Sequence, residues 1–154
     1  MAAGAFSLYR ANIDDLSMAD IAGATVKMAL VSSTYTPNAA NNGHTLWADV
    51  SANEIANGNG YTTGGFTLTD SIGLVTNGHY YDSDDPTWTA SVGSIPAWRY
   101  GVMYLSGTVA GMVNPLVGYF VGDSTPADVP ATTDGNPLTI TAPTGGWFTV
   151  TQAP

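Results

Sequence analysis

The sequence predicts an all-β fold, an antiparallel β-sandwich or small barrel of about seven strands with a short N-terminal helix. Straight-chain helix formers are scarce: the 154 residues include one Lys and one Glu, while Thr, Val, Tyr and Trp, which suit a half-buried pleated surface, are common. Short apolar stretches alternate with clusters of Gly, Pro, Asn and Asp that favour turns. The length fits one core, so we expect an N-terminal arm or helix at 1–23 and a single β-sandwich domain at 24–154.

A helical period is visible only near the N-terminus. Between positions 5 and 16, the apolar residues Phe6, Tyr9, Ile13 and Leu16 recur at spacings of three and four. This spacing places them on one face of a helix. We therefore expect the short helix in this segment.

Alternating apolar residues predict strands at 24–32 and 98–106. In the first, Val26, Met28 and Leu30 share one face and Lys27 points the other way. In the second, alternation places every other residue from Trp98 to Tyr104 on one face. The remaining expected strands are 66–76, which could be a hairpin around Gly73, and 86–92, 115–122, 138–142 and 147–152.

Two long segments are expected to be loops. Residues 33–65 are dominated by Asn, Gly and Pro, and predict a long surface excursion. Residues 123–137 contain three prolines and small polar residues, and form a loop long enough to be a contact arm.

The charge balance excludes several functions. The formal net charge is −9, which repels nucleic acid and anionic membrane surfaces. The chain has no cysteine, so neither a disulfide nor a thiolate metal site can form. The apolar runs are too short for a membrane span, and we expect no secretory signal.

Chemistry-bearing residues do not form a recognisable site. Asp82, Asp84 and Asp85 could hold a calcium ion, but Pro86 breaks the EF-hand pattern and a turn rich in Asp is the simpler interpretation. His44 and His79 lack zinc-ligand spacing, and no Gly-x-Ser-x-Gly motif is present. We therefore expect no enzyme activity, no metal and no cofactor.

The aromatic residues offer an alternative function. Four tryptophans and eight tyrosines could form a platform on which sugars stack. Trp88, Trp98 and Trp147 fall in expected strands and so belong in a core. Trp47, in the long excursion, is the better candidate for an exposed anchor.

The order of several short blocks resembles a widespread group of small structural proteins of tailed-bacteriophage virions. The blocks span about residues 25–151 and are specific in their order. They are TVKMALV at 25–31, YTPN at 35–38, LWADVSANEI at 46–55, GYTTGG at 60–65, DDPTW at 84–88, RYGVMY at 99–104, PLVGY at 115–119 and WFTV at 147–150.

The resemblance implies a structural component of the phage particle, made in the host cytoplasm. Our first hypothesis is a capsid decoration, or cement, protein on the capsid exterior, bound to the major capsid protein as a homo-oligomer, either trimer or dimer. The alternatives are a tail or head-fibre component that contacts a host receptor, and a carbohydrate-binding module. The residues we expect to contact a partner lie at 1–10, in the excursion and in the loop 123–137: Phe6, Leu8, Tyr9, Arg10, Trp47, Pro126, Val129 and Pro130.

Overall fold

Two long central strands organise the fold. In the computed structural model, β2 (Thr25–Val31) pairs antiparallel with β7 (Tyr100–Ser106) along its whole length. The alternation predicted for β2 is confirmed, since Val26, Met28 and Leu30 all face the main hydrophobic core. Side chains on the opposite face of β2 belong to a second buried cluster. The central pair is therefore covered on both sides.

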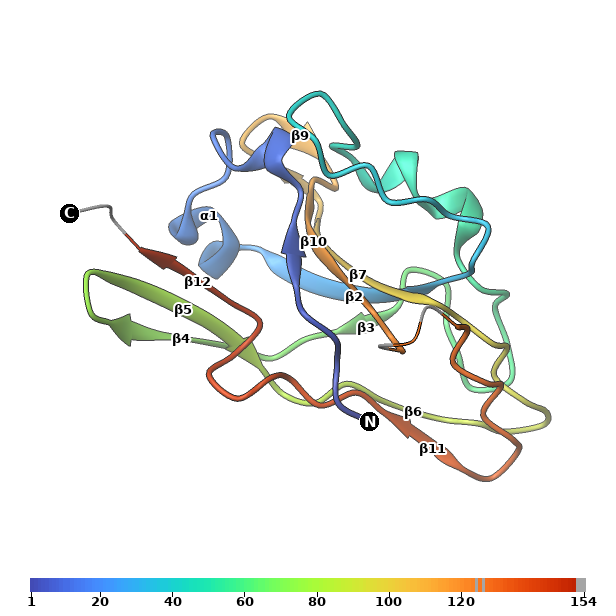
Figure 1. Ribbon diagram of the computed structural model, residues 1–154. Coiled ribbons are helices and arrows are strands. Elements are labelled where there is room, and N and C mark those ends of the chain that lie inside the picture. Colours follow the sequence, from blue (N-terminus) through green and yellow to red (C-terminus); the bar gives the residue numbers. More distant parts are fainter. Residues whose placement is uncertain (124, 126, 152–154) are drawn as a thin grey trace.

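The structure describes residues 1–123, 125 and 127–151. They form an antiparallel sandwich, which confirms the predicted fold class (Figure 1). The first sheet has the order β1-β10-β7-β2-β3. Its edge strands are β1 (Ser7–Leu8) and β3 (Phe66–Thr67), and β10 (Leu116–Val121) lies between β1 and β7.

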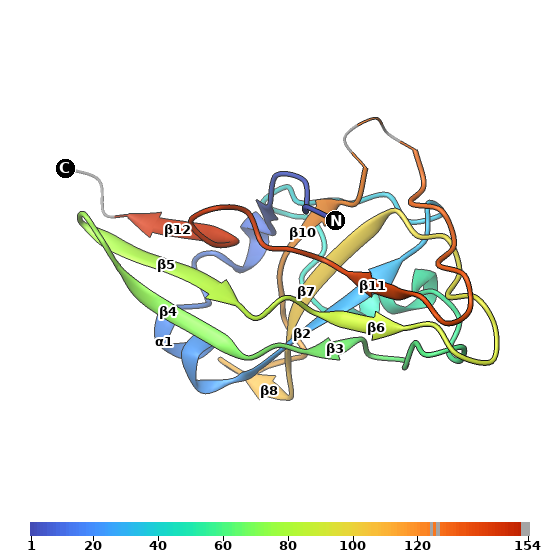
Figure 2. The ribbon, with the colours of Figure 1, turned by 90° about the horizontal axis from the view of Figure 1, so that it is seen from below.

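The second layer consists of two short sheets that follow one another along the molecule (Figure 2). One has the order β12-β5-β4 and the other pairs β11 with β6. A separate small hairpin, β8–β9, lies outside both layers. The bounds are β4 (Asp70–Val75), β5 (Gly78–Ser83), β6 (Thr87–Thr89), β8 (Thr108–Val109), β9 (Met112–Val113), β11 (Pro137–Thr139) and β12 (Phe148–Thr151).

The segment 33–65 is rich in turns, as predicted, but part of it is buried against the first sheet. It carries two 3-10 turns, Trp47–Asp49 and Ser51–Asn53. Tyr35 and Val50 are buried against the outer face of the first sheet, together with side chains of β2 and β7. The excursion thus covers one face of the central strands.

The helix expected at 5–16 is wrong in position. That segment holds β1 and a 3-10 turn at Arg10–Asn12, and the one α-helix in the described part of the chain is α1 (Met18–Gly23). Asn12, which is not part of the predicted apolar stripe, is buried, and its side-chain amide donates to the carbonyl oxygens of Thr45 and Leu116. These long-range contacts override the local period.

The N-terminal residues close the sandwich instead of forming a free arm. The backbone N–H of Ala3 donates to the carbonyl oxygen of Thr141, beside the second layer, at 3.1 Å. A few residues later Ser7 pairs with Tyr119 of β10 in the first sheet. One short segment is thus hydrogen-bonded to both layers.

Two further expectations need correction. Gly73 lies inside β4 opposite Tyr80, and the chain turns instead around Asn77, which has a φ of 60°. β7 begins at Tyr100, and Trp98 belongs to the main core instead of sharing a face with Val102. The backbone of Trp98 pairs with the loop that follows β10, and this explains why its side chain leaves the alternation of β7.

The helical part of the described chain is short. α1 has six residues, and neither α1 nor any 3-10 turn among the described residues has the length and apolar character of a membrane span.

Deleting residues 1–8 should lower the free energy of unfolding by about 3 kcal/mol or more, because it exposes the core surface under Phe6 and Leu8 and removes the pairing to both layers. Urea unfolding followed by tryptophan fluorescence measures this change. The exposed Val113→Ala substitution is the control, with an expected change within about 0.5 kcal/mol. A deletion that leaves the urea midpoint unchanged would show that the segment is a separable arm.

Candidate partner-binding surface

The sandwich is open along one side. The chain crosses directly from β3 to β4 at one edge of the two layers, whereas β1 and β12 are edge strands at the other. A cleft of about 320 Å³ lies at this edge, and none of the described residues that line it is charged. We call it the open-side groove and define it by six of the apolar residues that line it, Leu8, Ile13, Leu16, Met18, Phe148 and Val150.

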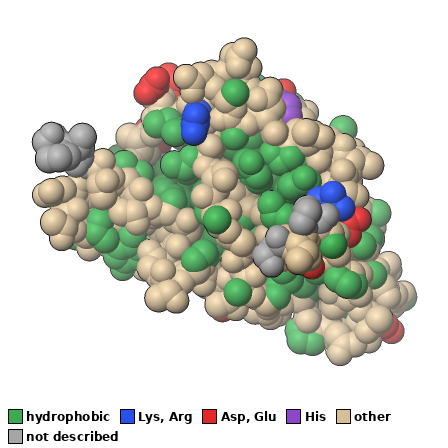
Figure 3. All heavy atoms as spheres, in the orientation of Figure 1, with side chains coloured by type: hydrophobic (Ala, Val, Ile, Leu, Met, Phe, Trp, Pro, Cys, Tyr) green, Lys and Arg blue, Asp and Glu red, His purple; other side chains and the backbone are tan. Residues whose placement is uncertain are grey.

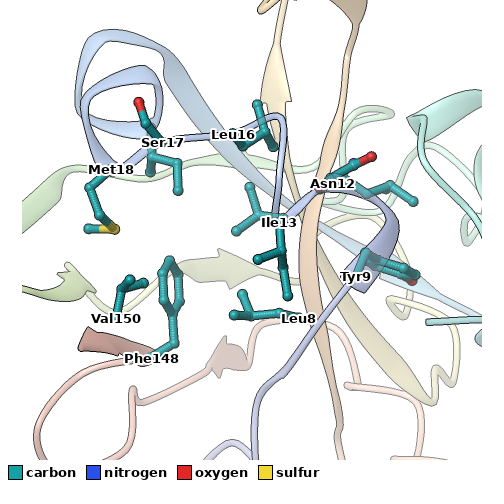
Figure 4. Close-up of a pocket in the computed structure, with 12 residues that line it drawn as sticks. Leu8, Tyr9, Asn12, Ile13, Leu16, Ser17, Met18, Phe148 and Val150 are labelled. Carbon is teal, nitrogen blue, oxygen red and sulfur yellow. Dashed lines mark hydrogen bonds between the residues drawn. The ribbon is translucent and has the colours of Figure 1, made fainter. Parts of the chain in front are cut away.

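The side chains of the groove come from two segments that are far apart in the sequence. Figure 4 shows the N-terminal residues facing Phe148 and Val150 across the cleft. Ile13 is 50% exposed and Val150 is 44% exposed, so both are accessible at the mouth. Both side chains line the same cleft, so they add to one contiguous apolar surface, and a contiguous apolar patch is one mark of a protein-binding surface.

A capping box fixes the N-terminal wall. The Ser17 hydroxyl accepts a hydrogen bond from the backbone N–H of Asp20, and the Asp20 carboxylate accepts hydrogen bonds from the Ser17 hydroxyl and backbone N–H. These bonds lower the pKa of Asp20. The box sets the first residue of α1, and so it places Met18 at the groove.

Aromatic stacking fixes the opposite wall. The Phe148 ring stacks on Phe6 at 5.6 Å and on Tyr81 at 5.2 Å between centroids. Next to it, Trp147 is buried and its indole N–H donates to the Ser83 hydroxyl at 2.9 Å. The wall is thus held by contacts with both layers and is formed before any partner binds.

A second, more polar hollow adjoins the groove. It shares Leu8, Ile13 and Phe148 with the groove and adds Phe6 and Arg10, among others. In Figure 3, hydrophobic side chains gather over this face, and the charged side chains are few. Phe6, Leu8 and Arg10, three of the residues expected to contact a partner, therefore lie together.

Tyr9, expected as a contact, is fully buried and presents no surface to a partner. Its hydroxyl lies 2.7 Å from that of Tyr35, which lies 2.8 Å from His44 Nδ1. Burial raises the pKa of Tyr9, and it raises the pKa of Tyr35 to about 12. Tyr9 therefore anchors the N-terminal segment to the excursion.

Trp47 is less exposed than expected for an anchor. Its indole stacks on the Tyr104 ring, with centroids 4.6 Å apart and planes 9° from parallel. The Tyr104 hydroxyl in turn donates to the carbonyl oxygen of Gly64. One face of the indole is therefore covered. Trp47 packs against the second buried cluster and is not among the residues that line the open-side groove.

The loop expected to be a contact arm is attached to the sandwich. Val129 exchanges two backbone hydrogen bonds with Trp98, and Asp128 forms an ion pair with Arg99 at 2.7 Å. Pro130 is exposed beside them. Pro126 lies outside the described residues.

The acidic cluster at 82–85 accepts hydrogen bonds from the backbone. Carboxylate oxygens of Asp82, Asp84 and Asp85 accept hydrogen bonds from the backbone N–H groups of Ser83, Thr69 and Ala142, respectively. Among residues 1–123, 125 and 127–151, no group of three or more His, Asp or Glu side chains is arranged to hold a metal ion. The cluster shapes the turn between β5 and β6.

Most of the groove could not be predicted from the sequence. Ile13 and Leu16 were expected on the apolar face of a helix, and Phe148 and Val150 in a strand, but nothing local says that these segments meet. One local signal was available: Ser17 followed by Asp20 is a capping-box pattern that indicates the true start of α1.

Compared with models of known protein families, with curated protein sequences and with solved structures, the chain matches none.

Replacing Tyr35 by Phe should lower the free energy of unfolding by about 1–3 kcal/mol, because the buried Tyr9 hydroxyl then loses its partner. Tyr119→Phe is the matched control, since its ring also packs on Tyr9 but no hydrogen bond of its hydroxyl is found among the described residues. Urea unfolding of both variants measures the difference. Equal losses would contradict a role for the hydroxyl chain.

Stability should fall at alkaline pH. Burial raises the pKa of Tyr104, like that of Tyr35, to about 12, and it also raises the pKa of Tyr61 and Tyr81. In the unfolded chain these groups ionise near pH ~10, so above that pH the folded state retains protons that the unfolded state has lost. The contribution of these tyrosines should therefore be constant below pH ~10, and the free energy of unfolding should decrease above that pH, as urea unfolding at a series of alkaline pH values would show. A constant value up to pH ~11.5 would contradict this.

Proposed function

We propose that this chain is a non-enzymatic structural protein of a tailed-phage particle, a decoration protein that binds the outer surface of the major capsid shell. Two independent observations support the proposal. The sequence blocks between about residues 25 and 151 resemble, in their order, those of small virion proteins. The sandwich also presents a preformed apolar groove, and this groove is the main structural observation in support of the proposal.

The groove suits protein binding because its walls are already fixed. Leu8 is held by the pairing of β1 with β10, and Phe148 by its stacking on two other rings. A partner side chain that enters the groove therefore buries apolar surface without first ordering this chain. Ile13 and Val150, at the mouth, would be the first residues to lose contact with water.

The charge distribution favours the same function. Only 15 of the 154 residues carry a formal charge. Interface cores are depleted in charge, because a charge that loses water without gaining a partner costs several kcal/mol. A shell repeats the same binding site many times, so modest contacts at each site can hold a layer of decoration proteins when the copies also contact each other.

Ile13→Asp should weaken binding to shells of the encoding phage from which this chain has been removed, by about tenfold or more, because the new carboxylate would be desolvated in the groove. Cosedimentation of purified chain with the shells gives the affinity.

Val113→Asp is the control, because Val113 is 59% exposed on β9, outside the groove. It should bind as the wild type does. Wild-type affinity of Ile13→Asp would contradict docking through the groove, and a wild-type chain that does not cosediment with the shells would contradict the proposed function.

A further inference from the structure

One edge of the second layer is paired along only part of its length. Residues 137–151 run antiparallel to residues 78–89, so β11 and β12 are consecutive parts of the same edge. The N-terminus covers the β11 part, where Ala2 pairs in parallel with Thr141. The chain then crosses to the first sheet, where β1 pairs with β10 (Figure 1). In the part of the chain that the structure describes, β12 is therefore left with β5 as its only neighbouring strand.

The outer edge of β12 presents unpaired backbone groups. In an edge strand of an antiparallel sheet, every second residue points its backbone N–H and C=O away from the neighbouring strand. Two residues separate β4 from β5, so Val75 and Gly78 beside this turn form a hydrogen-bonded pair. Counting in twos along β5 from that pair, Tyr81 bonds to Phe148, and the backbone of Thr149 points outwards. Outside its pairing with β5, no backbone hydrogen bond of β12 is found among the described residues.

The space beside this edge is open. Thr149 is exposed and lines the polar hollow of about 760 Å³ that adjoins the open-side groove. Neighbouring strands lie roughly 4.8 Å apart, so a strand added to β12 would occupy this hollow at the mouth of the groove. Residues directly opposite each other on adjacent strands share a face of the sheet. The inward side chains of the added strand would therefore lie beside Phe148 and Val150 and enter the groove.

An extended chain segment fits this site better than a folded surface does. Thr149 offers hydrogen bonds to another backbone, and the groove beside it offers apolar contacts to side chains at alternate positions of that backbone. If β12 of a second copy paired here, it could not supply those side chains, because its Phe148 is already stacked on Phe6 and Tyr81. The pairing of Ala2 shows that the same edge accepts a short extended segment.

We propose that the shell protein adds an extended segment to β12 as an outer strand and places apolar side chains, at alternate positions of that segment, in the open-side groove. The inference rests on the proposed function and specifies how the partner is held. Hydrogen bonds between the two backbones give affinity, and the groove selects the side chains of the segment.

Hydrogen–deuterium exchange of the wild-type chain, free and bound to shells that lack it, tests the proposal. Exchange at the amide of Thr149 should slow by about tenfold or more in the bound state, because this N–H then donates to the added strand. By the same counting, the amide of Leu74 points outwards from β4, the other edge strand of this sheet. Its exchange should be the same in both states and serves as the control.

Thr149→Pro removes the outward N–H and places a ring where the added strand must approach. It should weaken cosedimentation with the shells by about tenfold or more. Leu74→Pro makes the same change at the other edge and should bind as the wild type does. Thr149→Ala keeps the N–H and should also bind as the wild type does. The exchange measurement needs no variant, so it decides the question even where a proline variant fails to fold.

Shell binding without slower exchange at Thr149, or wild-type affinity of Thr149→Pro, would overturn the added strand and leave the proposed function in place. A wild-type chain that does not bind the shells would overturn both. Slower exchange at Thr149 that develops with rising concentration of the chain alone would show that a second copy occupies the edge, and would overturn the assignment to the shell protein.

Discussion

The pairing of β2 with β7 determines how the remaining elements pack. Both strands are buried on both faces, so the fold needs a cover on each side. The second layer covers one face, and the turn-rich excursion covers the other. Because both faces of the central strands are already covered, the N-terminal segment packs at the open edge of the sandwich, where β1 pairs with β10. The groove exists because this closure is incomplete.

Much of the fold could be predicted, because the apolar pattern of central strands is local. The alternation of Val26, Met28 and Leu30 identified β2 and its core face. β5 was missed because its acidic end, at Asp82, suggested a turn, although Asn77 followed by Gly78 is a strong hairpin signal. The helix at 5–16 failed because Asn12 is held by carbonyl groups distant in sequence, which no local period can reveal.

The candidate surface was harder to predict than the fold. Phe6, Leu8 and Arg10 were singled out as N-terminal residues, and they do lie at the open side. Their neighbours on β12 come from the other end of the chain, and only the closure of the sandwich brings Phe148 next to Phe6. The low number of charged residues, by contrast, is evident from the composition alone. A surface with few charges loses little solvation free energy when a partner covers it.

The copy number of this chain in purified phage particles would show whether it is a capsid decoration protein. Quantitative mass spectrometry can compare it with the major capsid protein of the same particles. A decoration protein follows the symmetry of the shell, so the account predicts a ratio near one to one, or one copy to a few capsid subunits. A ratio of a few per cent or less would contradict a capsid decoration protein and favour a component of the tail or of a head fibre.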